Sequence, residues 1–388
     1  MLEIYFDYNA TTALDPAVRD AMLPVLGATW GNPSSVHRVG RAARAALDDA
    51  RYRLASCWEC RPSEVVFTSG GTESNNLAIL GTAQILRDRR RHLVATPVEH
   101  PAVLQAVRYL ERHDGFQVTW LPVDAFGQVT VEAVNDAIRP DTALVTVMAA
   151  NNEIGTLQPV AAIGELCRSK GVLFHTDAVQ VFGKQPFTDI HQFNADLVSV
   201  CAHKFHGPKG AGALFVRSPL QPGSLVMGGA QENERRGGTE NLAGIVGLVE
   251  AFVRFVPTPV FIEATLREWT EELARGALAI PGVVRRGHPV QRLPNTVAFT
   301  VTGTDGMALV AGLDLDGICA SSGSACSAGS LEPSHVLQAI AVPAAEANAL
   351  IRFSLGRGNS GVEVQSVASR LESIIGRLRR GTRRGNRQ

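Results

Sequence analysis

The stretch EVVFTSGGTESNN, residues 64–76, joins a short apolar run to a glycine turn and the start of a helical pattern. The run Glu64–Thr68 contains β-branched and aromatic residues, which predicts a strand. We predict that a helix follows over Glu73–Leu86, with Thr72 as its N-cap. A strand that leads through a turn into a helix is the repeating unit of α/β proteins.

The same alternation of apolar runs and helical patterns continues to about residue 217. It favours an α/β layer with a mostly parallel sheet. The further strands are predicted at His92–Thr96, Ala143–Met148, Val172–Asp177, Asp196–Cys201 and Ala211–Arg217, and the helices at Ala102–Arg112 and Ala161–Lys170.

The pattern of predicted strands and helices changes after about residue 258. There we predict a long amphipathic helix at Glu263–Ile280, a strand at Thr296–Val301, and a capping box of Ser360 and Glu363 that opens a final helix.

These two patterns of predicted elements indicate two domains. We expect a large α/β domain over residues 16–258, and a smaller α+β domain formed by residues 1–15 and 259–388. The arginine-rich end, Arg377–Gln388, is interpreted as a solvated, frayed tail, with partner binding as the alternative.

Composition excludes several classes of protein. The 37 basic residues are balanced by 37 acidic ones, which argues against a nucleic-acid binder. No stretch approaches the roughly 18 apolar residues of a membrane span, and Glu3 and Asp7 do not fit a secretory signal. Six cysteines are too few for a disulfide framework in a chain of 388 residues, which favours a reducing cytoplasm.

A primary amine can come from only four side chains, Lys170, Lys184, Lys204 and Lys209. Lys204 follows a predicted strand and stands between His203 and a Gly/Pro turn, so we interpret it as a Schiff-base lysine. Lys170 lies at a predicted helix end, Lys184 in a Gly-Lys-Gln-Pro turn, and Lys209 in the loop after Lys204.

Two other predicted strand ends carry residues that suit a phosphorylated cofactor. Ser69–Thr72 opens a helix with two glycines, which favours a phosphate, although such a segment is often only a turn. Asp177 suits a cationic ring nitrogen, although it could equally be a helix N-cap. Together with Lys204, these residues indicate pyridoxal phosphate.

A second reactive centre is predicted around Cys326. Its neighbours over residues 321–330 are all small, which fits an exposed nucleophile on a mobile loop, with a linker that carries an incidental cysteine as the alternative. Arg352 and Arg357 are candidates for binding a substrate carboxylate, although Arg352 could equally be structural.

These motifs resemble those of the NifS/IscS-type cysteine desulfurases, which are fold-type I pyridoxal phosphate enzymes. The resemblance runs through almost the whole chain and implies that fold, with a large mostly parallel α/β domain and a smaller α+β domain. Cys201 before His203 and Lys204 is similar to the pattern of the nitrogen-fixation branch. The matching segments are residues 6–12, 31–35, 67–76, 99–103, 151–155, 175–180, 202–210, 235–241, 321–335 and 352–357.

The resemblance implies a role for each residue around the cofactor ring. Lys204 would carry the cofactor, His100 would stack on its ring and help in proton transfer, and Asp177 would pair with the ring nitrogen. Gln180 and Asn152 would bond the phenolic oxygen, with Asn152 also near the substrate.

It also implies a phosphate site formed by Gly71, Thr72 and His203. Cys201 takes the place of a serine that bonds the phosphate in many relatives, and a thiol is the weaker donor. Thr239 of the neighbouring subunit would reach the same phosphate, which makes a homodimer part of the site.

For the reaction, the resemblance implies conversion of L-cysteine to L-alanine. Arg357 would bind the substrate carboxylate, Lys204 would take the Cα proton, and Cys326 would accept the sulfur as a persulfide. An iron–sulfur scaffold protein or another sulfur acceptor would then receive it.

Several alternatives stay open. The first alternative is another enzyme of the same fold: a selenocysteine lyase, another lyase or an aminotransferase. The second is an inactive scaffold that binds partners through the arginine tail. Cys57 and Cys60 form a C-x-x-C pair that the family pattern does not need, and one pair cannot complete a zinc site. We interpret them as incidental helix cysteines and expect no metal.

Overall fold

The larger part of the fold is organised by a seven-stranded sheet. The computed structural model describes residues 3–259, 263–323 and 333–385. The four strand pairs between β7 and β4 are parallel, whereas β8 runs antiparallel to both of its neighbours. The order across the sheet is β2 (Val65–Thr68), β8 (Gly212–Val216), β7 (Leu197–Cys201), β6 (Leu173–Asp177), β5 (Thr142–Thr146), β3 (His92–Ala95) and β4 (Gln117–Trp120).

Alternate side chains of each strand pack into opposite helical layers. In β2, Val65 and Phe67 belong to one apolar cluster and Val66 to another. Because side chains alternate along a strand, burial on both faces requires the uninterrupted apolar runs seen in the sequence. One layer contains α2 (Arg38–Trp58), α6 (Val131–Ala137), α7 (Val160–Ser169) and α8 (Leu242–Phe255), and the other contains η2 (Leu77–Gly81), α4 (Thr82–Leu86) and α5 (Pro101–His113).

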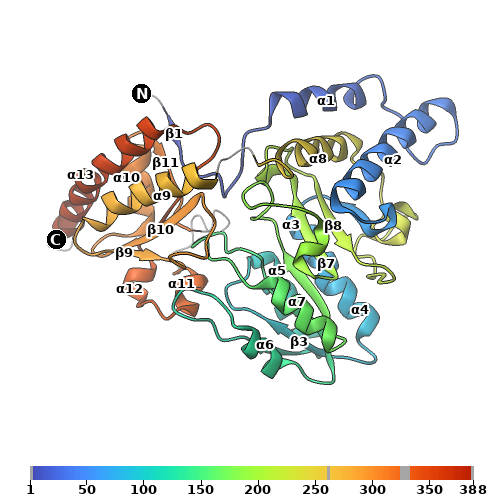
Figure 1. Ribbon diagram of the computed structural model, residues 1–388, viewed down its shortest axis with the longest axis horizontal. Coiled ribbons are helices and arrows are strands. Elements are labelled where there is room, and N and C mark those ends of the chain that lie inside the picture. The colour runs from blue at the N-terminus through green and yellow to red at the C-terminus, as the bar shows by residue number, and fades with distance from the viewer. Residues whose placement is uncertain (1–2, 260–262, 324–332, 386–388) are drawn as a thin grey trace.

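A second, antiparallel sheet organises the rest of the chain, drawn in orange and red in Figure 1. Leu273 and Leu371 of its two long helices pack with Phe299 in one apolar cluster. This region comprises β9 (Val283–Arg286), β10 (Thr296–Val301), β12 (Leu350–Ser354), α9 (Glu263–Leu278), α10 (Gly306–Asp314), α11 (His335–Ala339), α12 (Ala344–Ala347) and α13 (Gly361–Gly385).

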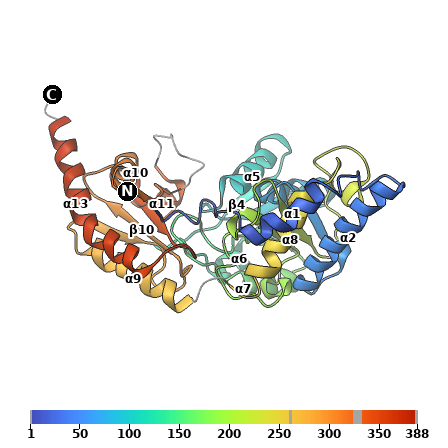
Figure 2. The ribbon, with the colours of Figure 1, turned by 90° about the horizontal axis from the view of Figure 1, so that it is seen from above.

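The N-terminal segment connects the two parts. Its short strand β1 (Ile4–Tyr5) pairs in parallel with β11 (Ile318–Cys319), so the start of the chain lies with its C-terminal third. The segment then crosses to α1 (Pro16–Leu26), which packs against α8 in the larger part. Figure 2 shows the two parts side by side, with α13 on the far side of the smaller one.

The structure corrects two details of the sequence prediction. The helix predicted at 73–86 begins earlier, as α3 (Gly71–Asn76), and changes to π-helical form in η2 before α4. Its N-cap is Gly70 rather than Thr72, because the backbone turns there with a φ of 152°, which glycine adopts readily. The predicted fraying from Arg377 was also wrong as far as Gly385, since α13 continues to that residue and Arg379 Nε donates to the carbonyl of Thr302 at 3.0 Å, whereas residues 386–388 lie outside the described residues.

The start of α13 agrees with the sequence. Ser360 N donates to Glu363 Oε2 at 2.7 Å, and Glu363 N donates to Ser360 Oγ at 3.3 Å, so the capping box is confirmed. Within the described part of the chain, no helix combines the length and the apolar character that crossing a membrane requires.

Candidate active site

A cavity of about 200 Å³ lies at the carboxyl ends of β6 and β7, beside the N-terminal segment. It gathers ten residues that the sequence singled out: Gly71, Thr72, His100, Asn152, Asp177, Gln180, Cys201, His203, Lys204 and Arg352. The remaining lining residues are Asn9, Ala10, Asn75, Met148 and Val179. Parallel strands bring their carboxyl ends to one edge of a sheet, which is why residues far apart in sequence meet here.

One end of the cavity is formed by the glycine turn before α3. A side chain at Gly71 would bring its Cβ to 2.9 Å from Val179, so this position has room only for glycine. Burial raises the pKa of the Cys201 thiol, which keeps it protonated. Burial, with Lys204 nearby, lowers the pKa of His203 to about 4, so its ring is neutral at neutral pH. Backbone N–H groups and neutral donors of this kind suit a phosphate.

Asp177 is held at the end of β6 by two donors. Asn75 Nδ2 donates to its Oδ2 at 2.6 Å, and Val179 N donates to its Oδ1 at 3.0 Å. The carboxylate is 6% exposed and lines the cavity, so it can pair with a cationic ring nitrogen there.

His100 forms another wall and caps α5. Its Nδ1 accepts from Ala102 N at 3.1 Å, which assigns the ring proton to Nε2 when the ring is neutral. Burial lowers the pKa of His100; Lys204 and His335 act in the same direction, and Asp177 opposes them. The ring is therefore poised to stay uncharged at neutral pH.

Lys204 comes from η4 (Ala202–Lys204), the short 3₁₀ turn that follows β7. Its Nζ donates to the carbonyl oxygens of Asn9 and Ala10 at 2.7 and 2.8 Å. Backbone carbonyls of the crossing segment thus help to hold the amine at the cavity.

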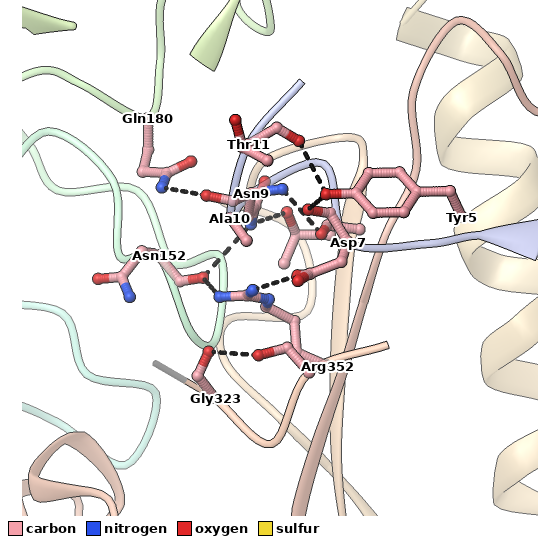
Figure 3. Close-up of polar contacts among 12 residues, drawn as sticks. Tyr5, Asp7, Asn9, Ala10, Thr11, Asn152, Gln180, Gly323 and Arg352 are labelled. Atoms are coloured by element: carbon pink, nitrogen blue, oxygen red, sulfur yellow. Dashed lines mark hydrogen bonds and ion pairs between the residues drawn. The ribbon is translucent and has the colours of Figure 1, made fainter. Parts of the chain in front are cut away.

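The structure separates the two arginine candidates. Arg352 is 1% exposed and lines the cavity, where its Nη1 donates to the carbonyl of Asn152 at 2.7 Å and its Nη2 to Asp7 at 2.5 Å (Figure 3). Arg357 instead pairs with Asp15 at 2.6 Å and is absent from the described lining of the cavity.

Comparison with known proteins assigns the chain to a family. The model of the aminotransferase class-V family matches residues 4–367. The chain belongs to the aminotransferase class-V family. Two relatives named cysteine desulfurase IscS support a narrower assignment: that of Methanosarcina thermophila is 44% identical over 97% of this chain and 93% of its own length, and that of Dictyoglomus turgidum is 42% identical over 97% and 95%.

Solved structures support the same family assignment. A NifS-like protein matches with a TM-score of 0.89 at 35% identity, covering 97% of this chain and all of its own. A structure titled SspA in complex with cysteine matches with a TM-score of 0.80 at 37% identity, covering 91% and 98%. The predicted fold class and the resemblance to cysteine desulfurases are therefore confirmed, and with them the expectation of an enzyme.

Three residues that line this cavity or adjoin its lining residues were not identified from the sequence. Asn9 lies between the two parts of the fold, where its N–H donates to Ser354 Oγ at 2.9 Å and its carbonyl accepts from Lys204. Lys184, interpreted as a turn lysine, is buried next to Gln180. Glu153 accepts from Ser334 Oγ at 2.5 Å. The sequence held a signal for Lys184, because it lies four residues after Gln180 and two residues at this spacing share one side of a helical turn.

Thr239 does not line the cavity in its own chain. It faces a separate hollow of about 250 Å³, together with Ser69 and Arg236. Its contact with a phosphate in a neighbouring subunit stays a prediction.

Besides Cys201, three cysteines were singled out from the sequence, Cys326 and the pair Cys57 and Cys60. Cys326 lies outside the described residues. Burial raises the pKa of Cys60 to about 12 and also raises that of Cys57, so neither thiol ionises readily at neutral pH. Among the residues that the structure describes, no three histidine, cysteine or acidic side chains are grouped as metal ligands would be.

Proposed function

We propose that this chain is a pyridoxal phosphate-dependent cysteine desulfurase that converts L-cysteine to L-alanine and collects the sulfur as a persulfide on Cys326. The observation that carries the proposal is the meeting of Lys204, Asp177 and His100 with the Gly70–Gly71 turn in one cavity. The desulfurases among its relatives support the choice of cysteine as substrate.

The polar groups around the cavity fit this cofactor. Lys204 supplies the amine for its aldehyde, and Asp177 supplies the carboxylate for its ring nitrogen. The start of α3, Cys201 and His203 supply neutral donors for its phosphate, and Gln180 and Asn152 supply amides for its phenolic oxygen. When bound, pyridoxal phosphate accepts the electrons released at the substrate Cα.

Three residues of the chain have separate roles in the reaction. Lys204, once released, takes the proton from Cα, and the neutral ring of His100 can carry a proton at Nε2. The Cys326 thiolate attacks the substrate sulfur, so that a sulfur–sulfur bond forms as the bond from Cβ to sulfur breaks. The thiolate is the reactive form, which makes this step pH-dependent.

For the substrate carboxylate we propose Arg352 in place of Arg357. Arg352 lines the cavity, and among the described residues its Nε has no hydrogen-bond partner. A guanidinium that is already aligned by Asp7 and Asn152 loses little further conformational freedom on binding a carboxylate.

We further propose that the enzyme is a cytoplasmic homodimer, in which Thr239 of the partner subunit completes the phosphate site. The persulfide would pass to an iron–sulfur scaffold protein or to another sulfur acceptor. The position of Thr239 outside its own chain's cavity supports the exchange of this residue between subunits.

Mass spectrometry of the protein loaded with pyridoxal phosphate and treated with L-cysteine tests the proposal. We expect one extra sulfur on Cys326 and an equal amount of alanine. Cys326→Ser should abolish the modification, whereas Cys57→Ser should leave it in place. If Cys326→Ser released alanine and sulfide at the parent rate, or if the parent did not take up pyridoxal phosphate, the proposal would be wrong.

A further inference from the structure

A second lysine lies against the wall of the cavity. Lys184 is 5% exposed, and its Nζ donates to Oδ1 of Asn9 at 3.0 Å and to Oε1 of Gln180 at 2.5 Å. Both acceptors are uncharged amides of cavity residues. Burying an amine beside uncharged acceptors costs free energy, so the position of Lys184 calls for a functional explanation.

The local backbone places Lys184 and Gln180 on the same side of a turn. They are four residues apart, and the N–H of Lys184 bonds to the carbonyl of Val181 as in one turn of a helix. Gly183, with a φ of 73°, lets this turn approach Phe205, whose Cβ would lie 3.1 Å from any added Cβ. The two side chains therefore converge on Asn9.

The charges around Lys184 make it sensitive to an anion in the cavity. Burial holds the pKa of Lys184 well below its usual range; Lys204 and Arg352 add to that effect, and Asp7 opposes it. A ligand oxygen that carries negative charge nearby would favour the ammonium form.

We propose that Lys184 is a positioning residue that orients the Gln180 amide, so that its Nε2 faces the cavity and donates to the phenolic oxygen of the cofactor. This deepens the proposed function and rests on it. In its ammonium form, which an anionic ligand oxygen favours, Lys184 has only hydrogens to offer and requires an oxygen from Gln180, because a flipped amide would set donor against donor. Nε2 then lies on the other side of the amide, where one of its two hydrogens bonds to the carbonyl of Asn9 at 3.1 Å (Figure 3) and the second is left for the phenolic oxygen.

The pH titration of the cofactor's visible absorbance tests this role. When the phenolic oxygen loses a donor, it holds its proton more tightly. We therefore expect Lys184→Met and Gln180→Leu each to raise the midpoint by about half to one pH unit, a three- to tenfold change in proton affinity. Because Lys184 acts through Gln180, the double variant should shift the midpoint no further than Gln180→Leu alone.

Lys170→Met is the matched control, since Lys170 is exposed at the end of α7 and should leave the midpoint unchanged. Thermal unfolding of the cofactor-free variants shows whether they fold; if Lys184→Met does not, Lys184→Gln replaces it, with a smaller expected shift because one donor remains. An unchanged midpoint, or shifts that simply add, would overturn the inference. A parent protein without a visible cofactor band would instead contradict the proposed function.

Discussion

The Asp7 carboxylate lies 2.5 Å from Nη2 of Arg352, between the crossing N-terminal segment and β12. The side chain of Arg352 is 2% exposed and that of Asp7 is 17% exposed. This ion pair connects the start of the chain to the sheet of the smaller part, and it aligns a guanidinium at the cavity.

Removing Asp7 should destabilise the protein strongly. Asp7→Ala would leave a buried guanidinium without its carboxylate, which costs about 3–5 kcal/mol. Urea unfolding of the cofactor-free protein measures this free energy. Glu272→Ala removes the half-buried partner of the exposed Arg275 in the same part of the fold and should cost no more than about 1 kcal/mol. Equal losses in the two variants would show that the Asp7 pair contributes no more than a surface pair.

The two arginines should differ in their effect on substrate binding. Arg352→Lys loses the planar fork that matches a carboxylate, so we expect KM for L-cysteine to rise about tenfold. Arg357→Lys keeps a cation beside Asp15 and should change KM by less than about twofold. Steady-state kinetics measures both, and retained cofactor absorbance shows that each variant is loaded. The reverse order of effects would favour Arg357 as the carboxylate ligand.

Glu99 should make the stability of the protein fall as the pH rises. Burial raises the pKa of its carboxyl from 4.5 to about 8. Between these values the folded state holds a proton that the unfolded state has released, so the contribution is complete below about pH 4.5 and is lost as the pH rises through 8.

Glu99→Gln removes this titration while keeping a side-chain oxygen for Thr96 and for the backbone of Met148. The parent should therefore lose stability relative to the variant by up to about 1.4 kcal/mol per pH unit in that window. Denaturant unfolding at several pH values provides the measurement. A difference between parent and variant that is constant across the window would contradict a raised pKa.

Glu153 contacts described residues on both sides of Cys326 in the sequence, and we expect it to affect persulfide formation there. Its Oε2 accepts from Ser334 Oγ, and a Cβ on Gly323 would lie 3.0 Å from the same oxygen, so Glu153 is next to both of these residues. We expect Glu153→Gln to slow persulfide formation on Cys326 by about tenfold, by weakening a charge-assisted hydrogen bond of roughly 1.5–3 kcal/mol.

Rapid-quench mass spectrometry follows that rate, while the visible spectrum checks that the cofactor site is intact. Ser334→Ala removes the same contact from the other side and should slow the step similarly. Persulfide formation at the parent rate in both variants would mean that this contact has no part in the transfer.

Much of the site could be predicted from sequence because its residues occupy recognisable local positions. Asp177 ends one buried strand, Lys204 closely follows another, and Gly71 begins the helix after a third. Local rules on strands, turns and helix starts are enough to place such residues at one sheet edge. Distances between the elements were not needed for that inference.

The sequence by itself predicted six of the seven strands of the larger sheet, the glycine turn and a strand-end position for Lys204, because apolar periodicity and backbone chemistry act over a few neighbouring residues; β4 was not predicted. Only the tertiary structure decided that Arg352 rather than Arg357 lines the cavity, that Lys184 is buried beside Gln180, and that Asn9 connects both parts of the fold. The two arginines are five positions apart in the chain, and the choice between them depends on contacts with Asp7, Asn152 and Asp15, which lie far away in sequence. Long-range packing sets those contacts, and no local pattern encodes them.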